Sequence, residues 1–168
     1  MTVSSHAVAA RGSDAERYLT FVLAGEMYAL PIRDVTEIIE HRPLTTVPLA
    51  PAHVRGVINL RGRAVPVVDL LSRFGQMGST EAGRRSAIVI VDLAAGGGDV
   101  EEGTARHVGI LVDAVNSVMH LDADDVEPPP SFDGGLDTAL VSGMARHEDR
   151  FVVVLDLRGV LGGIQLGF

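Results

Sequence analysis

The chain has 168 residues, 46% of them apolar, and a net charge of −8 at pH 7. This length is enough for one good-sized core or two small fused ones. The acidic balance argues against a nucleic-acid partner, because proteins that bind phosphate backbones concentrate basic residues on one face. There is neither lysine nor cysteine, which excludes Schiff-base and P-loop lysine chemistry and all thiolate sites.

No stretch approaches the roughly 18 consecutive apolar residues of a membrane span, and the N-terminal sequence MTVSSHAVAARGSDAER lacks an apolar signal-peptide core. We therefore predict a cytoplasmic protein with no direct membrane insertion. Residues 1–16 are small and polar without periodicity, which predicts a flexible tail.

Short β-branched runs separated by Gly, Pro and polar turns predict about ten strands. Val35, Ile38 and Ile39 recur at i, i+3 and i+4, which predicts a short helical turn in RDVTEII. A similar spacing after Asp69 predicts a second short helix that ends at Gly75. The expected strands lie at 18–23, 27–32, 44–47, 57–60, 65–68, 87–93, 108–112, 115–121, 136–145 and 151–155.

The stretch GVINLRGRAVPVVDLLSRFG, from Gly56 to Gly75, predicts a β-hairpin followed by a helix. Gly62 can adopt the positive φ of a tight turn, which places Arg61 near the hairpin tip. Asp69 ends the second strand and is expected to cap the helix.

The same pattern returns 87 residues later, from Gly143 to Gly162. Seven of the 20 aligned positions are identical without a gap, where residue frequencies give about one or two. A weaker repeat pairs residues 28–35 with 108–115. The chain therefore contains two related halves, each too small to bury a generous core alone.

These patterns predict an all-β fold with a few short helices, arranged as two small barrels side by side and packed as one unit. The approximate halves are 17–75 and 86–162. A loop rich in glycine, serine and charge joins them at 76–85.

The candidates for catalysis or metal binding have simpler explanations. The six histidines share no helical spacing that would point two of them at one ion. The segment 122–127 contains four acidic residues, but it lacks the loop glycine and the closing bidentate glutamate of a calcium-binding loop. We expect these side chains to form a solvated face. The glycines at 96–98 lack the lysine of a phosphate-binding loop, and Ser142 has no hydrolase motif around it. Asp69 and Asp156 follow equivalent strands, which favours helix capping over a catalytic carboxylate pair.

Arg61 is different, because its counterpart in the repeat is Glu148 and the shared fold therefore does not require arginine. Two interpretations stay open at this point. Arg61 is either an ordinary solvated turn residue or a contact for a partner's carboxylate, to which a planar guanidinium is well suited.

These motifs resemble the CheW family of chemotaxis coupling proteins. The resemblance extends from Tyr18 to Leu161 and rests on YALPIRDVTEII, RGVINLRGRAVPVVDLLSRFG, VGILVDAVNSVM with EPPP, and SGMARHEDRFVVVLDLRGVL. It implies two SH3-like five-stranded β-barrel subdomains packed as one domain over 17–162, with a C-terminal tail at 163–168. The lengthened turn at 94–106 and the ending GGIQLGF depart from the family pattern.

The resemblance also implies a non-catalytic adaptor without cofactor or metal. Such an adaptor links the cytoplasmic tip of methyl-accepting chemoreceptors to the regulatory domain of the histidine kinase CheA. The family's partner-binding positions carry over to Val35, Glu37, Ile38, Gly56 and Arg61.

Three alternatives remain open from the sequence. One is a coupling protein of a chemosensory-like pathway that controls surface motility or development. A second is the CheW-like regulatory domain of a larger kinase. The third, from a different class, is a small β-barrel enzyme.

Overall fold

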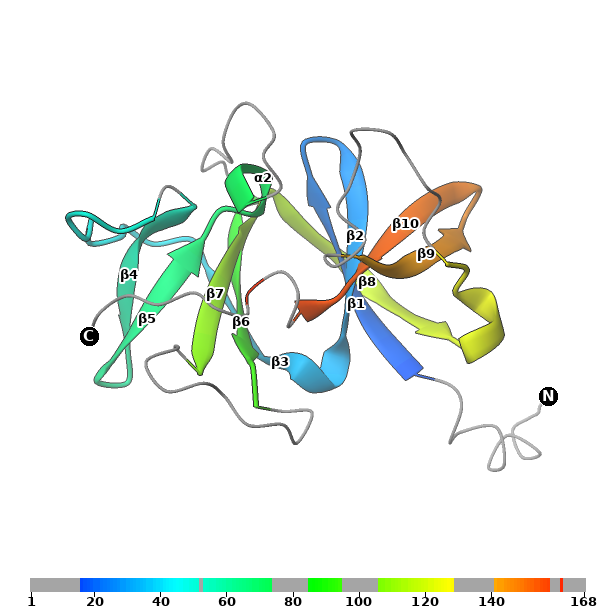
Figure 1. Ribbon diagram of the computed structural model, residues 1–168, viewed down its shortest axis with the longest axis horizontal. Helices are drawn as coiled ribbons and strands as arrows, with labels where there is room; N and C mark the ends of the chain where they lie inside the picture. The colour runs from blue at the N-terminus through cyan, green and yellow to red at the C-terminus, as the bar shows by residue number, and fades with distance from the viewer. Residues whose placement is uncertain are drawn as a thin grey trace.

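The computed structural model describes residues 16–51, 53–73, 85–94, 106–128, 141–157 and 161 (Figure 1). Strands dominate these segments, so the predicted all-β fold with a few short helices is confirmed. The elements in chain order are β1 (Glu16–Leu23), β2 (Glu26–Pro31), the 3-10 turn η1 (Ile32–Asp34), β3 (Val35–Glu40), β4 (Val54–Leu60), β5 (Arg63–Val68), α2 (Leu70–Arg73), β6 (Ala87–Asp92), β7 (His107–Val112), β8 (Ala114–Leu121), the 3-10 turn η2 (Ala123–Asp125), β9 (Val141–His147) and β10 (Arg150–Leu155).

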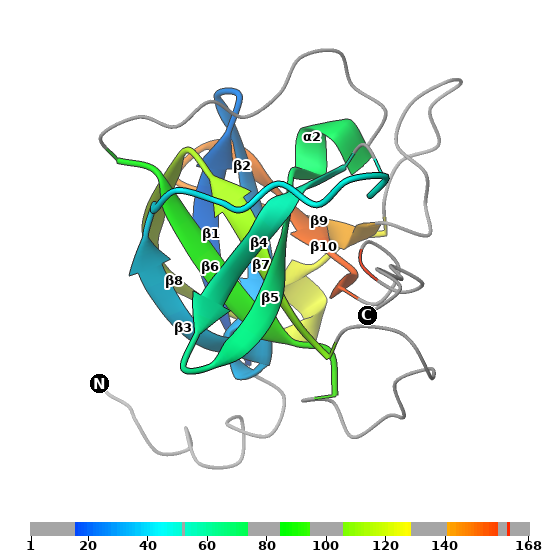
Figure 2. The ribbon, with the colours of Figure 1, turned by 90° about the vertical axis from the view of Figure 1, so that its left-hand side faces the viewer.

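The strands form two five-stranded sheets that lie side by side along the long axis of the molecule (Figure 1). The first sheet has the order β3-β6-β7-β5-β4, and the second has the order β8-β1-β2-β10-β9. Each sheet curls, and in the end-on view the tip of the β4–β5 hairpin lies beside β3 (Figure 2). The two five-stranded, SH3-like subdomains implied by the sequence are confirmed.

The sheets do not coincide with the sequence halves. The β6–β7 hairpin of the second half lies between β3 and β5 of the first half, and the β1–β2 hairpin lies between β8 and β10. The inserted hairpins pair antiparallel with β3 and β8 and parallel with β5 and β10, where Val67 lies opposite Gly109 and Val154 lies opposite Ala29. Each half therefore completes its sheet only with a hairpin from the other half.

The internal repeat is visible in the backbone. The bounds of β9 and β10 are those of β4 and β5, each shifted by the same 87 residues. Both hairpins also receive a short incoming segment through an isolated antiparallel bridge, which pairs Thr45 with Val57 in one and Glu127 with Met144 in the other. The repeat inferred from the sequence thus describes two equivalent structural units.

Among the described residues, buried apolar side chains form three clusters. The largest joins the two sheets, because it contains Phe21 and Leu30 of the second sheet together with Val89 and Ile110 of the first. Two smaller clusters lie within single sheets, one around Ile88 and Ile90 in the first and one around Met119 and Val152 in the second. Burial of apolar area across both sheets makes them one unit.

Residues 35–40 are a strand, and the helical turn predicted in RDVTEII is wrong. Four of the six residues in VTEIIE are β-branched, which favours an extended chain. A bulge between Val35 and Glu37 leaves Thr36 without a partner in β6. The apolar spacing that mimicked a helix arises from this irregular strand. The predicted strand at 44–47 is also reduced to the single bridge at Thr45.

Asp69 caps the short helix α2, as predicted. Its Oδ1 accepts a hydrogen bond from the Leu71 amide at 3.0 Å, and its Oδ2 accepts one from Arg55 Nη1 at 3.1 Å. Asp69 is fully buried, whereas Asp156 is exposed. Capping of this kind contributes about 1 kcal/mol.

Several predicted segments fall outside the described residues. They include most of the loop at 76–85, most of the turn at 94–106, the start of the strand predicted at 136–145, the glycines at 96–98, the C-terminal tail, and the N-terminal tail except Glu16, which begins β1. None of the helices in the described ranges has the length and apolar character needed to cross a membrane.

The exchanged hairpins give a testable prediction about folding. We expect fragments 16–75 and 85–168 each to lack a cooperative thermal transition alone, because the central strands of each sheet come from the other fragment. An equimolar mixture is expected to recover sheet signal and elute as a 1:1 complex. Far-UV circular dichroism and size-exclusion chromatography measure this, and a cooperative transition from either fragment alone would contradict it.

Candidate functional site

Arg61 occupies the tip of the β4–β5 hairpin, as predicted. Both central residues of the turn have positive φ, 53° for Arg61 and 84° for Gly62, which is the pattern of a type I′ turn. The Asn59 side chain accepts a hydrogen bond from the Gly62 amide at 2.9 Å and fixes the turn. The turn holds the Arg61 side chain in solvent, where 74% of its surface is exposed.

Arg61 forms a two-point ion pair with Glu37 of β3. Nη1 donates to Oε1, and Nη2 donates to Oε2 at 3.1 Å. The hydrogen bond from Arg61 holds the pKa of the Glu37 carboxyl below its usual range, and the same bond raises the pKa of Arg61. Strands β3 and β4 are the two edges of the first sheet, so the pair links the edges that curling brings together.

A pocket of about 310 Å³ opens beside this pair. Leu60, Val65 and Ile90 provide its apolar surface, and Thr36, Glu37, Arg61, Arg63 and His107 provide its polar surface. Thr36, Arg63 and His107 were not singled out from the sequence, because they come from three different strands with no local pattern in common. We call this surface the barrel-mouth pocket.

The structure separates the other residues predicted on β3. Burial alternates along the strand, so Val35 and Glu37 share the more buried face and Ile38 points the other way. Val35 packs against the cluster that joins the two sheets. Ile38 is 43% exposed and is available on the outer face of this edge strand.

Gly56 lies on β4 and provides clearance for a neighbouring segment. A Cβ at this position would lie 2.6 Å from the Thr45 carbonyl oxygen and 3.0 Å from the Leu44 Cβ. Gly143, its counterpart in the repeat, meets the Glu127 carbonyl oxygen in the same way at 2.5 Å. Of the five predicted partner-binding residues, the structure therefore brings Glu37 and Arg61 into contact and places Gly56 elsewhere on β4.

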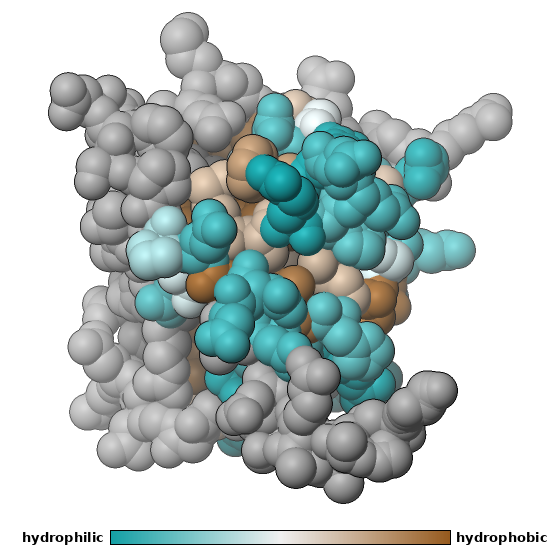
Figure 3. Space-filling view, turned by 90° about the vertical axis from the view of Figure 1, so that its right-hand side faces the viewer, coloured by the Kyte–Doolittle hydropathy of each residue, from teal (hydrophilic) through white to brown (hydrophobic). Residues whose placement is uncertain are grey.

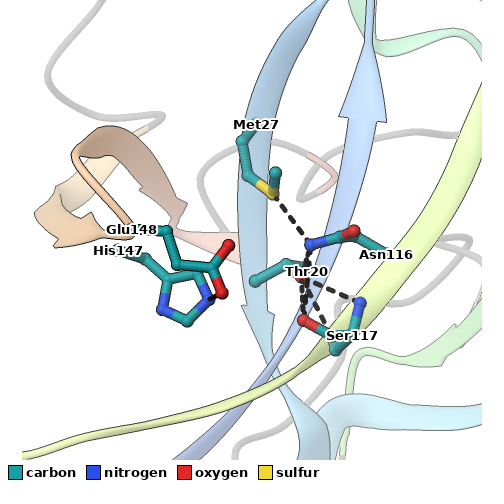
Figure 4. A network of polar contacts seen from close by, with 6 residues as sticks. All are labelled: Thr20, Met27, Asn116, Ser117, His147 and Glu148. Carbon is teal, nitrogen blue, oxygen red and sulfur yellow. Dashed lines mark hydrogen bonds and ion pairs between the residues drawn. The ribbon is translucent and has the colours of Figure 1, made fainter.

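The second sheet has a neutral network where the first has the ion pair. Ser117 occupies the position of Glu37, because each follows the bulge residue of an equivalent edge strand. Its amide donates to Thr20 Oγ1 at 3.1 Å, and Thr20 Oγ1 also interacts with the Ser117 carbonyl and with Asn116 (Figure 4). In Glu148, the counterpart of Arg61, Oε1 instead lies 3.8 Å from Nε2 of His147.

The end of the molecule formed by the second sheet has apolar side chains scattered among polar ones (Figure 3). Val118 and Phe151 are among the exposed apolar residues of this sheet. The Arg146 guanidinium lies 5.3 Å from the centre of the Phe151 ring, a cation–π contact. Within the described segments, no group of three or more histidine and acidic side chains is placed to hold a metal ion.

Comparisons with known proteins agree with this architecture. The family model described as "CheW-like domain" matches residues 17–165. Chemotaxis protein CheW of Klebsiella aerogenes is 28% identical over 151 residues, which cover 90% of this chain and 84% of that protein. Protein FrzA of Myxococcus xanthus is 27% identical over 125 residues, covering 74% and 71%.

A solved structure is similar over most of the fold. The crystal structure of the scaffolding protein TtCheW from Thermoanaerobacter tengcongensis superimposes with a TM-score of 0.73 and 34% sequence identity, covering 86% of each chain. At this identity and overlap the likeness extends to both sheets.

The Glu37–Arg61 pair predicts a pH dependence of stability. Because the folded-state pKa of Glu37 is lowered, its stabilising contribution is complete above the ordinary glutamate value of about 4.3 and is lost as pH falls through the folded-state pKa. The difference in Tm between the wild type and Arg61→Ala should therefore be largest near neutral pH and shrink in acid. Thermal unfolding followed from pH 7 downward measures it, with Arg63→Ala as control. An equal difference at every pH would contradict this role.

Gly56→Ala should destabilise the fold by about 1–3 kcal/mol, the usual cost of overpacking a filled site. The obstacle is backbone, and reciprocal hydrogen bonds of 2.9 and 2.8 Å between Thr45 and Val57 hold it in place. Gly62→Ala is the control for backbone strain alone, because Gly62 also has a positive φ, 84°, but a Cβ there meets nothing within 4 Å, so Gly56→Ala should cost more. Chemical denaturation compares the two, and a Gly56→Ala protein as stable as the wild type would show that the neighbouring segment yields freely.

Proposed function

The chain belongs to the CheW-like domain family, and from this premise we propose that it is a non-catalytic adaptor of a chemotaxis signalling pathway. It holds the regulatory domain of a CheA-type histidine kinase at the cytoplasmic tip of methyl-accepting chemoreceptors. The match of the family model over residues 17–165 is the observation that carries this proposal. The protein acts in the cytoplasm and reaches receptor arrays through its partners.

An adaptor acts by proximity and needs no chemistry of its own. Each partner buries roughly 800 Å² of this protein at a standard interface. Binding both partners at once turns their encounter into an intramolecular event at high effective concentration. The large apolar cluster shared by the sheets supports this role, because a rigid body holds two partners in a fixed relative orientation.

The barrel-mouth pocket is the proposed contact for one partner. A guanidinium has five N–H donors, and the ion pair with Glu37 uses one on each terminal nitrogen. The remaining donors suit a carboxylate from a partner, and Glu37 holds the side chain in place for it. Ile38 adds an exposed apolar contact on the opposite face of β3.

A second candidate keeps the adaptor role and changes the pathway. The similarity to protein FrzA of Myxococcus xanthus over 125 residues favours a chemosensory-like pathway for surface motility or development. Deleting the gene and scoring swimming and surface movement separately distinguishes the two pathways. A small β-barrel enzyme, the alternative from a different class, requires a cofactor, metal or turnover that mass spectrometry and activity screening of the purified protein would reveal.

Arg61→Glu should leave the fold intact and weaken kinase or receptor binding at least tenfold, because the change places two carboxylates together and removes the donors. Isothermal titration of each partner measures the affinity. The charge-swapped protein Glu37→Arg with Arg61→Glu is the matched control. It restores an ion pair between the same strands while presenting the opposite charge at the hairpin tip.

The two variants separate structure from recognition. If Arg61 contacts a partner, both Arg61→Glu and the charge swap bind weakly. If Arg61 only supports the fold, the charge swap recovers full affinity. A wild-type protein that binds neither partner would refute the adaptor function itself.

A further inference from the structure

The barrel-mouth pocket has a charge opposite to that of the whole chain. The chain carries a net charge of −8. The charged side chains that line the pocket are Arg61, Arg63 and Glu37, two cations and one anion, which leaves a net charge of +1. His107 adds ring nitrogens that donate or accept hydrogen bonds. A basic pocket in an acidic protein favours an anion as its ligand.

The charge left uncompensated in the pocket is that of Arg63. Both carboxylate oxygens of Glu37 accept hydrogen bonds from Arg61, so those two charges neutralise each other. Within the part of the chain that the structure describes, Arg63 forms no ion pair. It is exposed at the first residue of β5, directly after the hairpin turn. Because one positive charge is left over, the complementary ligand carries one negative charge.

The floor of the pocket is apolar. Val65 and Ile90 are buried, and Leu60 packs against the cluster to which both belong. An apolar group that enters the pocket displaces water from these side chains, which a small hydrated ion does not do. The volume of about 310 Å³ lies at the lower end of the range for small-molecule sites. The pocket therefore suits a small molecule with an apolar body.

The bulge in β3 adds a neutral donor to the same pocket. Thr36 has no partner in β6, and its exposed side chain lines the pocket together with Arg63. A hydroxyl and a guanidinium can each donate to one oxygen of a carboxylate. The fixed pair of Glu37 with Arg61 forms the adjoining wall, so part of the site is ordered before a ligand arrives.

We propose that the barrel-mouth pocket binds a small organic carboxylate with a compact apolar body, and that this free acid competes with the partner group that binds through Arg61. Arg63 and Thr36 hold the carboxylate, and the apolar floor contacts the body. The competition rests on the adaptor function proposed above, whereas the binding of the acid does not. Occupation by the acid lowers the fraction of adaptor that is open to the partner, so assembly responds to the concentration of a small molecule.

Isocaproate, a branched aliphatic carboxylate, is the probe for this site. The whole chain is titrated with it while the backbone amide chemical shifts are recorded. We expect saturable binding with a millimolar or lower dissociation constant, and shifts centred on residues 36–37, 60–65, 90 and 107. Isocaproamide has the same shape without the charge, and acetate has the charge without the apolar body. Each should bind at least tenfold more weakly than isocaproate.

Arg63→Gln removes the uncompensated charge and keeps a polar side chain of similar length. We expect this variant to bind isocaproate no more tightly than isocaproamide. Arg146→Gln is the matched control, because Arg146 lies on β9 of the second sheet and does not line this pocket. It should bind isocaproate as tightly as the wild type does.

The outcomes separate the site from the adaptor function. If isocaproate does not bind saturably, if the amide binds as tightly as the acid, or if the shifts lie outside the pocket, the site is refuted and the adaptor function stands on its own test. Competition is measured by titrating the kinase regulatory domain and a receptor fragment with and without saturating isocaproate. We expect the affinity of one partner to fall, and unchanged affinity for both refutes the competition while the site stands. If the wild type binds neither partner, the adaptor function fails and the isocaproate titration still decides the site.

Discussion

The parallel pairings of β5 with β7 and of β10 with β2 are the constraint on which the rest of the structure depends. Together with the antiparallel pairings of β3 with β6 and of β1 with β8, they hold a hairpin of one sequence half inside the sheet of the other, so neither sheet is complete without both halves. The insertion also sets the geometry of the candidate site. With β6 and β7 in the middle of the first sheet, β3 and β4 become its two edges, and curling brings Glu37 to Arg61.

The two copies of the repeat share backbone features, namely equivalent strands, glycines and bridges, and differ in their exposed side chains. Gly56 and Gly143 each admit a carbonyl oxygen of an incoming segment, and the bridges they permit are equivalent. Packing requires glycine at these two positions, because there is no room for an added methyl group. Packing places no such limit on the side chains at the hairpin tips. Arg61 and Glu148 carry opposite charges on the same type of turn. The two sheets therefore differ in the charge that they carry at these hairpin tips.

The sequence revealed what depends on local chemistry. The turn glycine, the apolar alternation and the Asp cap located the β4–β5 hairpin, its tip and α2. The second copy of this stretch, 87 residues later, located the β9–β10 hairpin. Two features could not be predicted from the sequence. The apolar spacing of VTEIIE fits a helix as well as a bulged strand, and only pairing with β6 decides between them. The exchange of hairpins, and with it the contact between residues 37 and 61, depends on long-range pairing that leaves no mark in local periodicity.

An exposed ion pair contributes little to stability, because water and salt screen it and both side chains lose freedom. Its value at Arg61 is orientation, since Glu37 fixes the guanidinium while leaving donors for another carboxylate. The bond from the Gly62 amide to the Asn59 side chain fixes the backbone of the same turn. The hairpin tip thus presents a fixed, exposed guanidinium at one edge of the first sheet.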